Sequence, residues 1–263
     1  MNNPFDLKDK VIILTGSSGL LGLQYAEGLA HAGANLVLVD NNIKKSKLVI
    51  NKISQKYENE SIIINTNLTD KDSIKKMVSQ TLKKFSKIDV LINNAAFSEG
   101  PNERNTPFEQ FSLKSWNNVI SVNLTGTMMC CQEIGKVMKN KHSGSIINIS
   151  SIYGLLGADQ RIYGNSGLNS SIAYATTKAA IINMTRYLAS YWHNTGIRIN
   201  TLSLGGVKNF QDPKFIRNYS KNTMLGRMAK KDEYVGALIF LSSNASSYMT
   251  GSNLVVDGGW TAW

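Results

Sequence analysis

VIILTGSSGLLG at residues 11–22 joins a short apolar run to a glycine-rich turn and the start of a helical pattern. The run from Val11 to Thr15 has the composition of a buried strand, and the apolar spacing from Leu20 to Ala32 is that of an amphipathic helix. Glycine permits a tight turn and brings backbone N–H groups close to a phosphate at a helix N-terminus. The stretch therefore predicts a strand–turn–helix unit that binds a dinucleotide pyrophosphate, and a turn without a ligand is the alternative for an isolated motif. The predicted contacts are Gly16, Ser18, Gly19, Leu21 and Gly22.

The alternation of strand and helix continues along the chain. Short β-branched runs alternate with stretches of helical length, and no Pro/Gly-rich linker divides them. The further predicted strands are 35–39, 61–65, 90–93, 145–149, 198–204 and 253–256. This order is typical of an α/β fold in which helices cover both faces of a parallel sheet. We expect a single doubly wound Rossmann-type domain over residues 1–263, with a parallel sheet of about seven strands.

Length and composition agree with such a domain. The chain has 263 residues, of which 42% are hydrophobic and 18% charged, so a disordered or fibrous chain is excluded. The longest apolar runs are far shorter than the roughly 20 residues that cross a bilayer. No basic segment followed by an apolar stretch marks a secretory signal. Cys130 and Cys131 are neighbours in sequence, and a disulfide between them would close no useful loop, which fits a reducing compartment. Together these observations predict a cytoplasmic protein with no membrane contact.

The net charge of +11 has two interpretations. It could serve an acidic partner such as nucleic acid, an acyl carrier protein or a phosphorylated substrate. Alternatively, 23 Lys against 6 Arg, dispersed among 28 Asn, reflect a compositional bias, because recognition surfaces favour clustered Arg. We favour the bias and expect no nucleic-acid partner. The histidines His31, His142 and His193 are scattered without partner ligands, so no metal site is expected.

A carboxylate follows the second predicted strand. Ligands of doubly wound sheets bind outside the carboxyl ends of the strands. At that place Asp40 can accept hydrogen bonds from the adenosine ribose hydroxyls and would repel a 2′-phosphate, which favours NAD over NADP as the cofactor. Lys44 and Lys45 could instead reach a phosphate, but they begin the next predicted helix and fit a solvated face as well.

Five more segments place small and polar residues in a distinctive order. They are Asn93–Ala96 after the fourth strand, Asn123 within VNLTG, Ser150–Gly154 after the fifth strand, the YxxxK motif of Tyr174–Lys178, and Val256–Gly259. In this order they resemble the short-chain dehydrogenase/reductase family, in its single-domain branch, over nearly the whole chain. The resemblance implies a hydride transfer with nicotinamide. It also implies further cofactor contacts at Asn67, Leu68, Asn94, Ala95, Tyr174, Lys178, Gly205, Val207 and Asn209.

Two segments depart from the family pattern. Leu20 stands where the shorter branch has glycine, because the spacing of the three glycines in the turn is that of the longer branch. Beyond the sixth strand, Leu204 replaces the usual proline, and Asn209 stands where a threonine often touches the cofactor. Cofactor binding is still expected, with the backbone of Val207 offered to the nicotinamide amide.

Tyr174 and Lys178 lie four residues apart, so they share one face of a helix. An ammonium near the phenol, together with the cationic oxidised nicotinamide, should lower the pKa of Tyr174 from about 10 and fit it for general acid–base work. Tyr174 is therefore the expected proton donor or acceptor. The resemblance assigns Ser151 a hydrogen bond to the substrate oxygen, and it assigns Asn123 a water that relays protons from Lys178 to solvent.

The stretch between Ser151 and Tyr174 is longer than in the shortest family members and contains DQRIYGN at 159–165. These side chains suit hydroxyls or a phosphate better than an alkyl chain, and a solvated surface loop is the alternative. We expect substrate loops near 155–172 and 205–225, with Arg161 and Tyr163 binding substrate beside Ser151. Together with residues 3–7, 186–192 and 246–251, this stretch resembles a subgroup of bacterial flagellin-glycan and legionaminic-acid-type oxidoreductases, whose substrates are sugars or sugar phosphates.

Three functions remain open. The favoured one is an NAD(H)-dependent oxidoreductase of a secondary alcohol or ketone, belonging to a sugar or sugar phosphate in surface-glycan biosynthesis. The second is a 3-oxoacyl-(acyl-carrier-protein) reductase, which the basic charge would suit but Asp40 disfavours, since such reductions usually use NADPH. The third is a non-catalytic nucleotide-sensing protein, whose expected mark, a lost Tyr or Lys, is absent. The family also implies a homotetramer or homodimer built on helices that contain 125–137 and 174–191.

Overall fold

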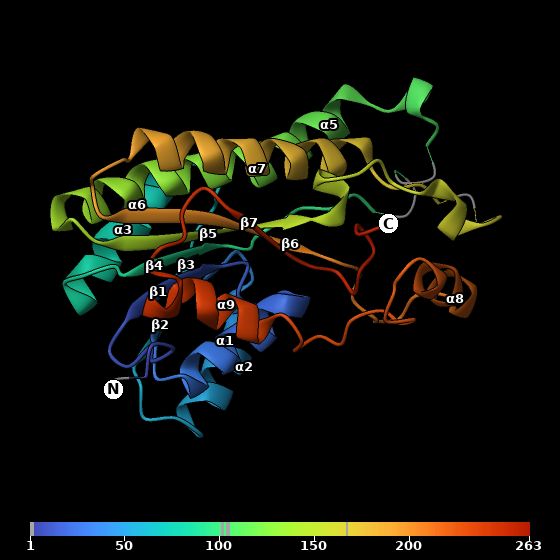
Figure 1. The fold of residues 1–263 in the computed structure, drawn as a ribbon. Helices are drawn as coiled ribbons and strands as arrows, with labels where there is room; N and C mark the ends of the chain where they lie inside the picture. The colour runs from blue at the N-terminus through green and yellow to red at the C-terminus, as the bar shows by residue number, and fades with distance from the viewer. Residues whose placement is uncertain (1–2, 101–102, 104–105, 167) are drawn as a thin grey trace.

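The computed structural model describes residues 3–100, 103, 106–166 and 168–263, and its centre is one parallel sheet (Figure 1). The strand order is β3-β2-β1-β4-β5-β6-β7. The strands are β1 Val11–Thr15, β2 Asn35–Asp40, β3 Ser61–Asn65, β4 Val90–Asn93, β5 Gly144–Ser151, β6 Ile197–Leu204 and β7 Asn253–Val256. The order reverses between β1 and β4, which is the arrangement of a doubly wound sheet. The predicted α/β fold with seven parallel strands is confirmed.

Helices cover both faces of the sheet. In Figure 1, α1, α2 and α9 lie on one side, and α3, α6 and α7 lie on the other. The helices are α1 Leu20–His31, α2 Ile43–Ser54, α3 Lys71–Phe85, α5 Leu113–Ile120, α6 Thr127–Lys141, α7 Ile172–Tyr191, α8 Pro213–Lys221 and α9 Val235–Ser242. Short turns of 3-10 helix are η1 Phe108–Gln110, η3 Ile152–Gly154, η4 Gln160–Tyr163 and η5 Asn244–Ser246, and η2 Ser121–Gly126 is a π-helix. Within the described ranges, no helix combines the length and the apolar character that a membrane span requires.

The strand β1 shows how the two faces are filled. Ile12 and Leu14 are fully buried in the core beneath α1 and α9, whereas Val11 and Ile13 belong to the core beneath α3 and α6. A strand buried on both faces needs a continuous apolar run rather than an alternating one. The run from Val11 to Leu14 therefore belongs to the middle of the sheet, where its order places it.

The paired central strands β5 and β6 are longer than predicted. Their register runs over eight residue pairs, from Gly144 opposite Ile197 to Ser151 opposite Leu204. The polar residues Ser150 and Ser151 interrupt the apolar pattern, but their backbone groups still join the ladder of β6. Backbone pairing, rather than side-chain hydrophobicity, thus determines where these strands end, and it brings Ser151 to the last position of β5.

Buried polar side chains attach α7 to the sheet. The Asn148 amide on β5 accepts a hydrogen bond from Asn93 on β4 at 2.8 Å and donates to the Thr185 hydroxyl of α7 at 2.9 Å. The Thr201 hydroxyl on β6 donates to the same Thr185 oxygen at 2.9 Å. Because every member is buried and bonded, the network holds the helix in one position on the sheet.

Candidate active site

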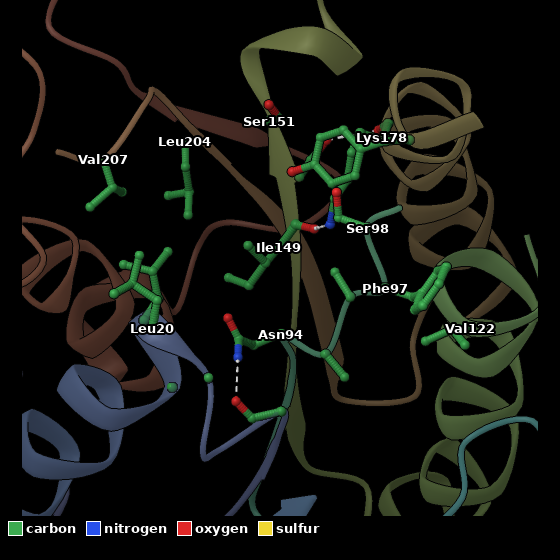
Figure 2. Close-up of a pocket in the computed structure, with 18 of the residues that line it drawn as sticks. Leu20, Asn94, Phe97, Ser98, Val122, Ile149, Ser151, Lys178, Leu204 and Val207 are labelled. Carbon is green, nitrogen blue, oxygen red and sulfur yellow. Dashed lines mark hydrogen bonds between the residues drawn. The ribbon is translucent and has the colours of Figure 1, made fainter. Parts of the chain in front are cut away.

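A cavity of about 840 Å³ opens at the carboxyl ends of the strands (Figure 2). Its walls come from the turn after β1, from the segments that follow β2 to β6, and from α7 and α8. Among the predicted residues, those in the lining are Gly16, Ser18, Gly19, Leu21, Gly22, Asp40, Asn67, Leu68, Asn94, Ala95, Ser151, Tyr163, Tyr174, Lys178, Gly205 and Val207. Both predicted substrate loops contribute, the first through Tyr163 and the second through Gly205 and Val207.

The glycine turn is built for close backbone contact. Gly16 has φ +66°, and a Cβ at that position would lie 2.7 Å from the Cα of Ala95. A Cβ on Gly22 would lie 2.1 Å from the Gly16 carbonyl oxygen. Gly19 is the N-cap of α1 and caps it with no side chain, and the first turn of this helix lines the cavity, so its N–H groups need a partner there. These features fit the pyrophosphate of a nicotinamide dinucleotide, and Leu20 adds a lining side chain that is 39% exposed.

Asp40 ends β2 beside this turn. Its carboxylate accepts hydrogen bonds from the backbone N–H of Ser18 at 3.0 Å and from that of Asn42 at 2.9 Å. The carboxylate is therefore held against the glycine turn at the cavity wall. Of the two lysines considered as phosphate ligands, Lys45 lines the cavity and Lys44 does not.

Tyr174, Lys178 and Ser151 all line the same cavity, and Figure 2 shows Ser151 and Lys178 well away from Leu20 of the glycine turn. The Lys178 Nζ lies 5.4 Å from the centroid of the Tyr174 ring and donates to the carbonyl oxygen of Ile149 at 2.8 Å. The Ser151 hydroxyl accepts from the Tyr153 N–H at 3.2 Å and also hydrogen-bonds with Tyr174. The neighbouring Ser150 donates its hydroxyl to the Lys178 carbonyl at 2.7 Å and so helps to hold α7.

The electrostatics of this group differ from the prediction. Burial raises the pKa of the Tyr174 phenol, and this effect exceeds the lowering that the hydrogen bond with Ser151 causes. Burial also lowers the pKa of the Lys178 ammonium to about 8. The expectation that Lys178 lowers the pKa of the tyrosine is wrong for the chain's own groups, because the ammonium bonds to a backbone carbonyl and is itself desolvated.

Three predicted residues lie outside the lining. The Asn123 side chain in η2 accepts from the Phe97 N–H at 2.7 Å and donates to the Phe97 carbonyl at 3.0 Å, so its amide is engaged by backbone. Asn209 is exposed, and its N–H donates to Gln211 at 2.6 Å. Arg161 is directed away from the cavity, because its guanidinium is paired with Asp159 and its side chain is 91% exposed. The interaction of Arg161 with substrate is therefore not supported by its position.

Other lining residues were not predicted. Phe97 and Ser98 follow β4. Phe215 and Tyr219 lie inside the predicted substrate loop 205–225 but were not named individually, and they stand four residues apart on α8, a helix within that predicted loop that begins with Pro213. The aromatic spacing after a proline is a signal for an amphipathic helix, but only the tertiary structure brings that helix over the cavity. Within the described residues, no three His, Cys, Asp or Glu side chains gather where they could hold a metal ion.

Comparison with known proteins agrees with this geometry. The family model described as enoyl-(acyl carrier protein) reductase matches residues 17–261. Sorbose reductase of Candida albicans is 32% identical, over 98% of this chain and 89% of its own. Post-translational flagellin modification protein A of Campylobacter coli is 29% identical, over 97% of this chain and 99% of its own. A 3-oxoacyl-(acyl-carrier-protein) reductase of Aquifex aeolicus is 31% identical, over 96% and 98% respectively.

Solved structures agree as well. Gluconate 5-dehydrogenase from Burkholderia cenocepacia, in complex with NADP and tartrate, is 28% identical with a TM-score of 0.88, over 99% of this chain and 98% of its own. A short-chain dehydrogenase from Leptospira borgpetersenii with bound NAD+ is 35% identical with a TM-score of 0.85, over 99% and 96%. The chain is therefore an oxidoreductase with a nicotinamide-cofactor site, and it belongs to the short-chain dehydrogenase/reductase family.

Proposed function

We propose that this chain is an NAD(H)-dependent oxidoreductase that acts on a secondary alcohol or ketone of a sugar or sugar phosphate in surface-glycan biosynthesis. The observation that carries the proposal is that Ser151, Tyr174 and Lys178 line one cavity together with Asp40 and the glycine turn. Such a cavity holds a dinucleotide along its length and leaves the reacting carbon beside the tyrosine.

The nicotinamide, when bound, supplies or accepts the hydride. During ketone reduction, the Ser151 hydroxyl donates to the substrate oxygen as negative charge develops there. The Tyr174 phenol then delivers its proton to that oxygen, and during alcohol oxidation it accepts a proton instead. Burial lowers the pKa of Lys178 to about 8, so near neutral pH its ammonium still holds a proton and can return one to the tyrosine after each reduction.

The preference for NAD over NADP is proposed from Asp40. Its two carboxylate oxygens are occupied by backbone N–H groups, which hold the negative charge beside the adenosine end of the cavity. A 2′-phosphate at that place would meet a carboxylate at short range. The related solved structures with NADP and with NAD+ establish that both cofactors occur among similar proteins, so the charge at Asp40 is the discriminating feature.

A sugar-like substrate is proposed from the lining near Tyr174. Ser98, Tyr153 and Tyr163 bring hydroxyl groups, and Phe215 brings an aromatic face from α8. Hydroxyl donors arranged around a small apolar surface suit a polyhydroxylated carbon chain. The sorbose reductase and gluconate 5-dehydrogenase relatives support this chemistry, and the flagellin modification protein supports a role in surface glycans. The Aquifex relative keeps 3-oxoacyl thioesters as the second candidate.

The test is a panel of ketoses, polyols, sugar phosphates and nucleotide sugars, followed at the nicotinamide absorbance with NAD(H) and NADP(H) in parallel. A 3-oxoacyl thioester is the control substrate. We expect turnover of a sugar substrate with NAD(H). Faster turnover of the thioester with NADPH would establish the second candidate, and inactivity on the whole panel would reject the proposed substrate class.

We also propose that the chain forms a homotetramer or homodimer through α6 and α7. Tyr187 and Tyr191 stack on one another along α7 with 67% and 64% of their surfaces exposed, and Met128 on α6 is 40% exposed. Exposed aromatic residues on a long helix are typical of a surface that another subunit covers. A monomer in light scattering at micromolar concentration would contradict it. A cytoplasmic location remains our proposal, because Cys130 and Cys131 are both free thiols.

A further inference from the structure

A buried glutamate outside the expected site contacts the helix that carries the active-site tyrosine. Glu99 is 6% exposed and accepts a hydrogen bond from the Ser171 hydroxyl at 2.5 Å. Ser171 is the N-cap of α7, and its side-chain oxygen accepts from the Tyr174 N–H at 3.1 Å. The Ser171 hydroxyl thus donates its only proton to the carboxylate and accepts a hydrogen bond from the helix.

The carboxylate is buried without a lysine or arginine partner among the described residues. Its second oxygen also has no hydrogen-bond partner in that part of the chain. Burial of a carboxylate costs stability unless nearby groups compensate it. The compensation here is the Ser171 hydroxyl and the positive N-terminal end of the 20-residue helix α7. Glu99 is therefore bound to the beginning of this helix.

Glu99 belongs to the segment that forms one wall of the cavity. Phe97 and Ser98, which precede it, line the cavity, and Figure 2 shows them on the same side as Lys178 and Val122. The structure thus links a cavity wall directly to the N-terminus of α7.

A second contact attaches the same segment to α7. The Asn123 amide bonds to both backbone groups of Phe97, and it also donates to the Thr177 hydroxyl at 3.5 Å. Thr177 lies three residues after Tyr174, and Ser171 lies three residues before it. The two attachments therefore bracket the tyrosine along the helix.

We infer that Glu99 is a positioning residue, which acts through Ser171 to hold Tyr174 in register with the cavity wall formed by Phe97 and Ser98. This inference rests on the proposed role of Tyr174 as proton donor and acceptor. It assigns Glu99 no contact with substrate or cofactor. A small displacement of a proton donor lowers turnover more than it weakens binding, because the geometry matters most in the transition state.

The test compares Glu99→Ala and Glu99→Gln, since Gln retains an oxygen that can accept from Ser171. With the best substrate of the panel, Glu99→Ala should lower kcat about tenfold and change the KM for NADH by less than about twofold. Glu99→Gln should retain more than about half of kcat. The double variant Glu99→Ala/Ser171→Ala should be no slower than Ser171→Ala alone, because both changes break the same connection. Additive losses, or equal losses in Ala and Gln, would overturn the inference.

A second measurement needs no substrate. The ultraviolet titration of Tyr174, obtained as the difference from a Tyr174→Phe version of each protein, reports the surroundings of the phenol. Glu99→Ala should shift its midpoint by about half a pH unit or more, and Glu99→Gln should leave it in place. The matched control is Glu133→Ala, which removes a glutamate of similar burial from α6 and should not move the midpoint. An unshifted midpoint in Glu99→Ala would refute the inference.

These readouts separate the two hypotheses. Inactivity of the parent protein on every sugar would reject the proposed substrate while the titration still decides the role of Glu99. If Glu99→Ala does not fold, Ser171→Ala and Ser171→Thr replace it, because only Thr retains the hydroxyl. A loss of kcat in Ser171→Ala together with its retention in Ser171→Thr would support the connection between Glu99 and Ser171. Equal kcat values in the two variants would refute it.

Discussion

Replacement of Lys178 by Met should stabilise the folded protein near pH 7 although it removes an active-site residue. The lysine is 3% exposed, and burial lowers its pKa from 10.5 to about 8. At about 1.36 kcal/mol per pH unit, that difference corresponds to about 3.4 kcal/mol of desolvation cost in the folded state. Met has a similar unbranched stem and no charge. The replacement of Lys178 leaves the Ile149 carbonyl without its hydrogen-bond donor, which costs about 1–3 kcal/mol of stability.

The change of this stability difference with pH is the more decisive test, because it does not depend on the hydrogen bond that the variant loses. Below pH 8 the lysine is protonated in both states, and the folded state bears the whole cost. Between pH 8 and 10.5 the folded lysine has lost its proton while the unfolded one retains it, so the parent becomes more stable as the pH rises. The stability of the Met variant relative to the parent should therefore fall by about 2.5 kcal/mol between about pH 7 and pH 10.

The assay is urea unfolding of parent and variant at both pH values, followed by fluorescence and circular dichroism to establish a two-state transition. Lys83→Met on α3, an exposed lysine, is the control and should show no such pH-dependent difference. A stability difference between Lys178→Met and the parent that stays constant with pH would refute the reasoning. It would mean that Lys178 is solvated in the folded state.

Tyr174→Phe should abolish proton transfer and retain the packing of the ring, so turnover should fall by about two orders of magnitude or more. NAD binding, measured by fluorescence titration, should survive. Turnover comparable to that of the parent would reject Tyr174 as the proton donor and acceptor. Asp40→Ala should lower the ratio of kcat/KM with NAD to kcat/KM with NADP, because it removes a negative charge from the cavity wall. If the parent protein binds NADPH more tightly than NADH, Asp40 does not select NAD. Arg161→Ala should leave kcat and KM within about twofold of the parent values, because the arginine side chain is 91% exposed and paired with Asp159. A large rise in the KM for substrate would show that Arg161 binds substrate.

The sequence by itself determined the fold and most of the cavity. Val11–Gly22 encodes its strand, turn and helix locally, because an apolar run buried on both faces and glycines with no room for a Cβ leave few alternatives. The spacing of Tyr174 and Lys178 likewise places both on one helix face, whatever surrounds them. Asp40 could be predicted because parallel strands end at a common edge, where residues far apart in sequence meet.

Only the tertiary structure decided which polar groups face the cavity and what their surroundings do to them. Arg161 and Tyr163 are two residues apart, yet the arginine pairs with Asp159 in solvent and the tyrosine lines the cavity. The pairing of Glu99 with Ser171 joins positions 72 residues apart, and no local pattern encodes such a contact. The pKa of Tyr174 depends on desolvation by the surrounding fold, which outweighs the lowering by the hydrogen bond with Ser151.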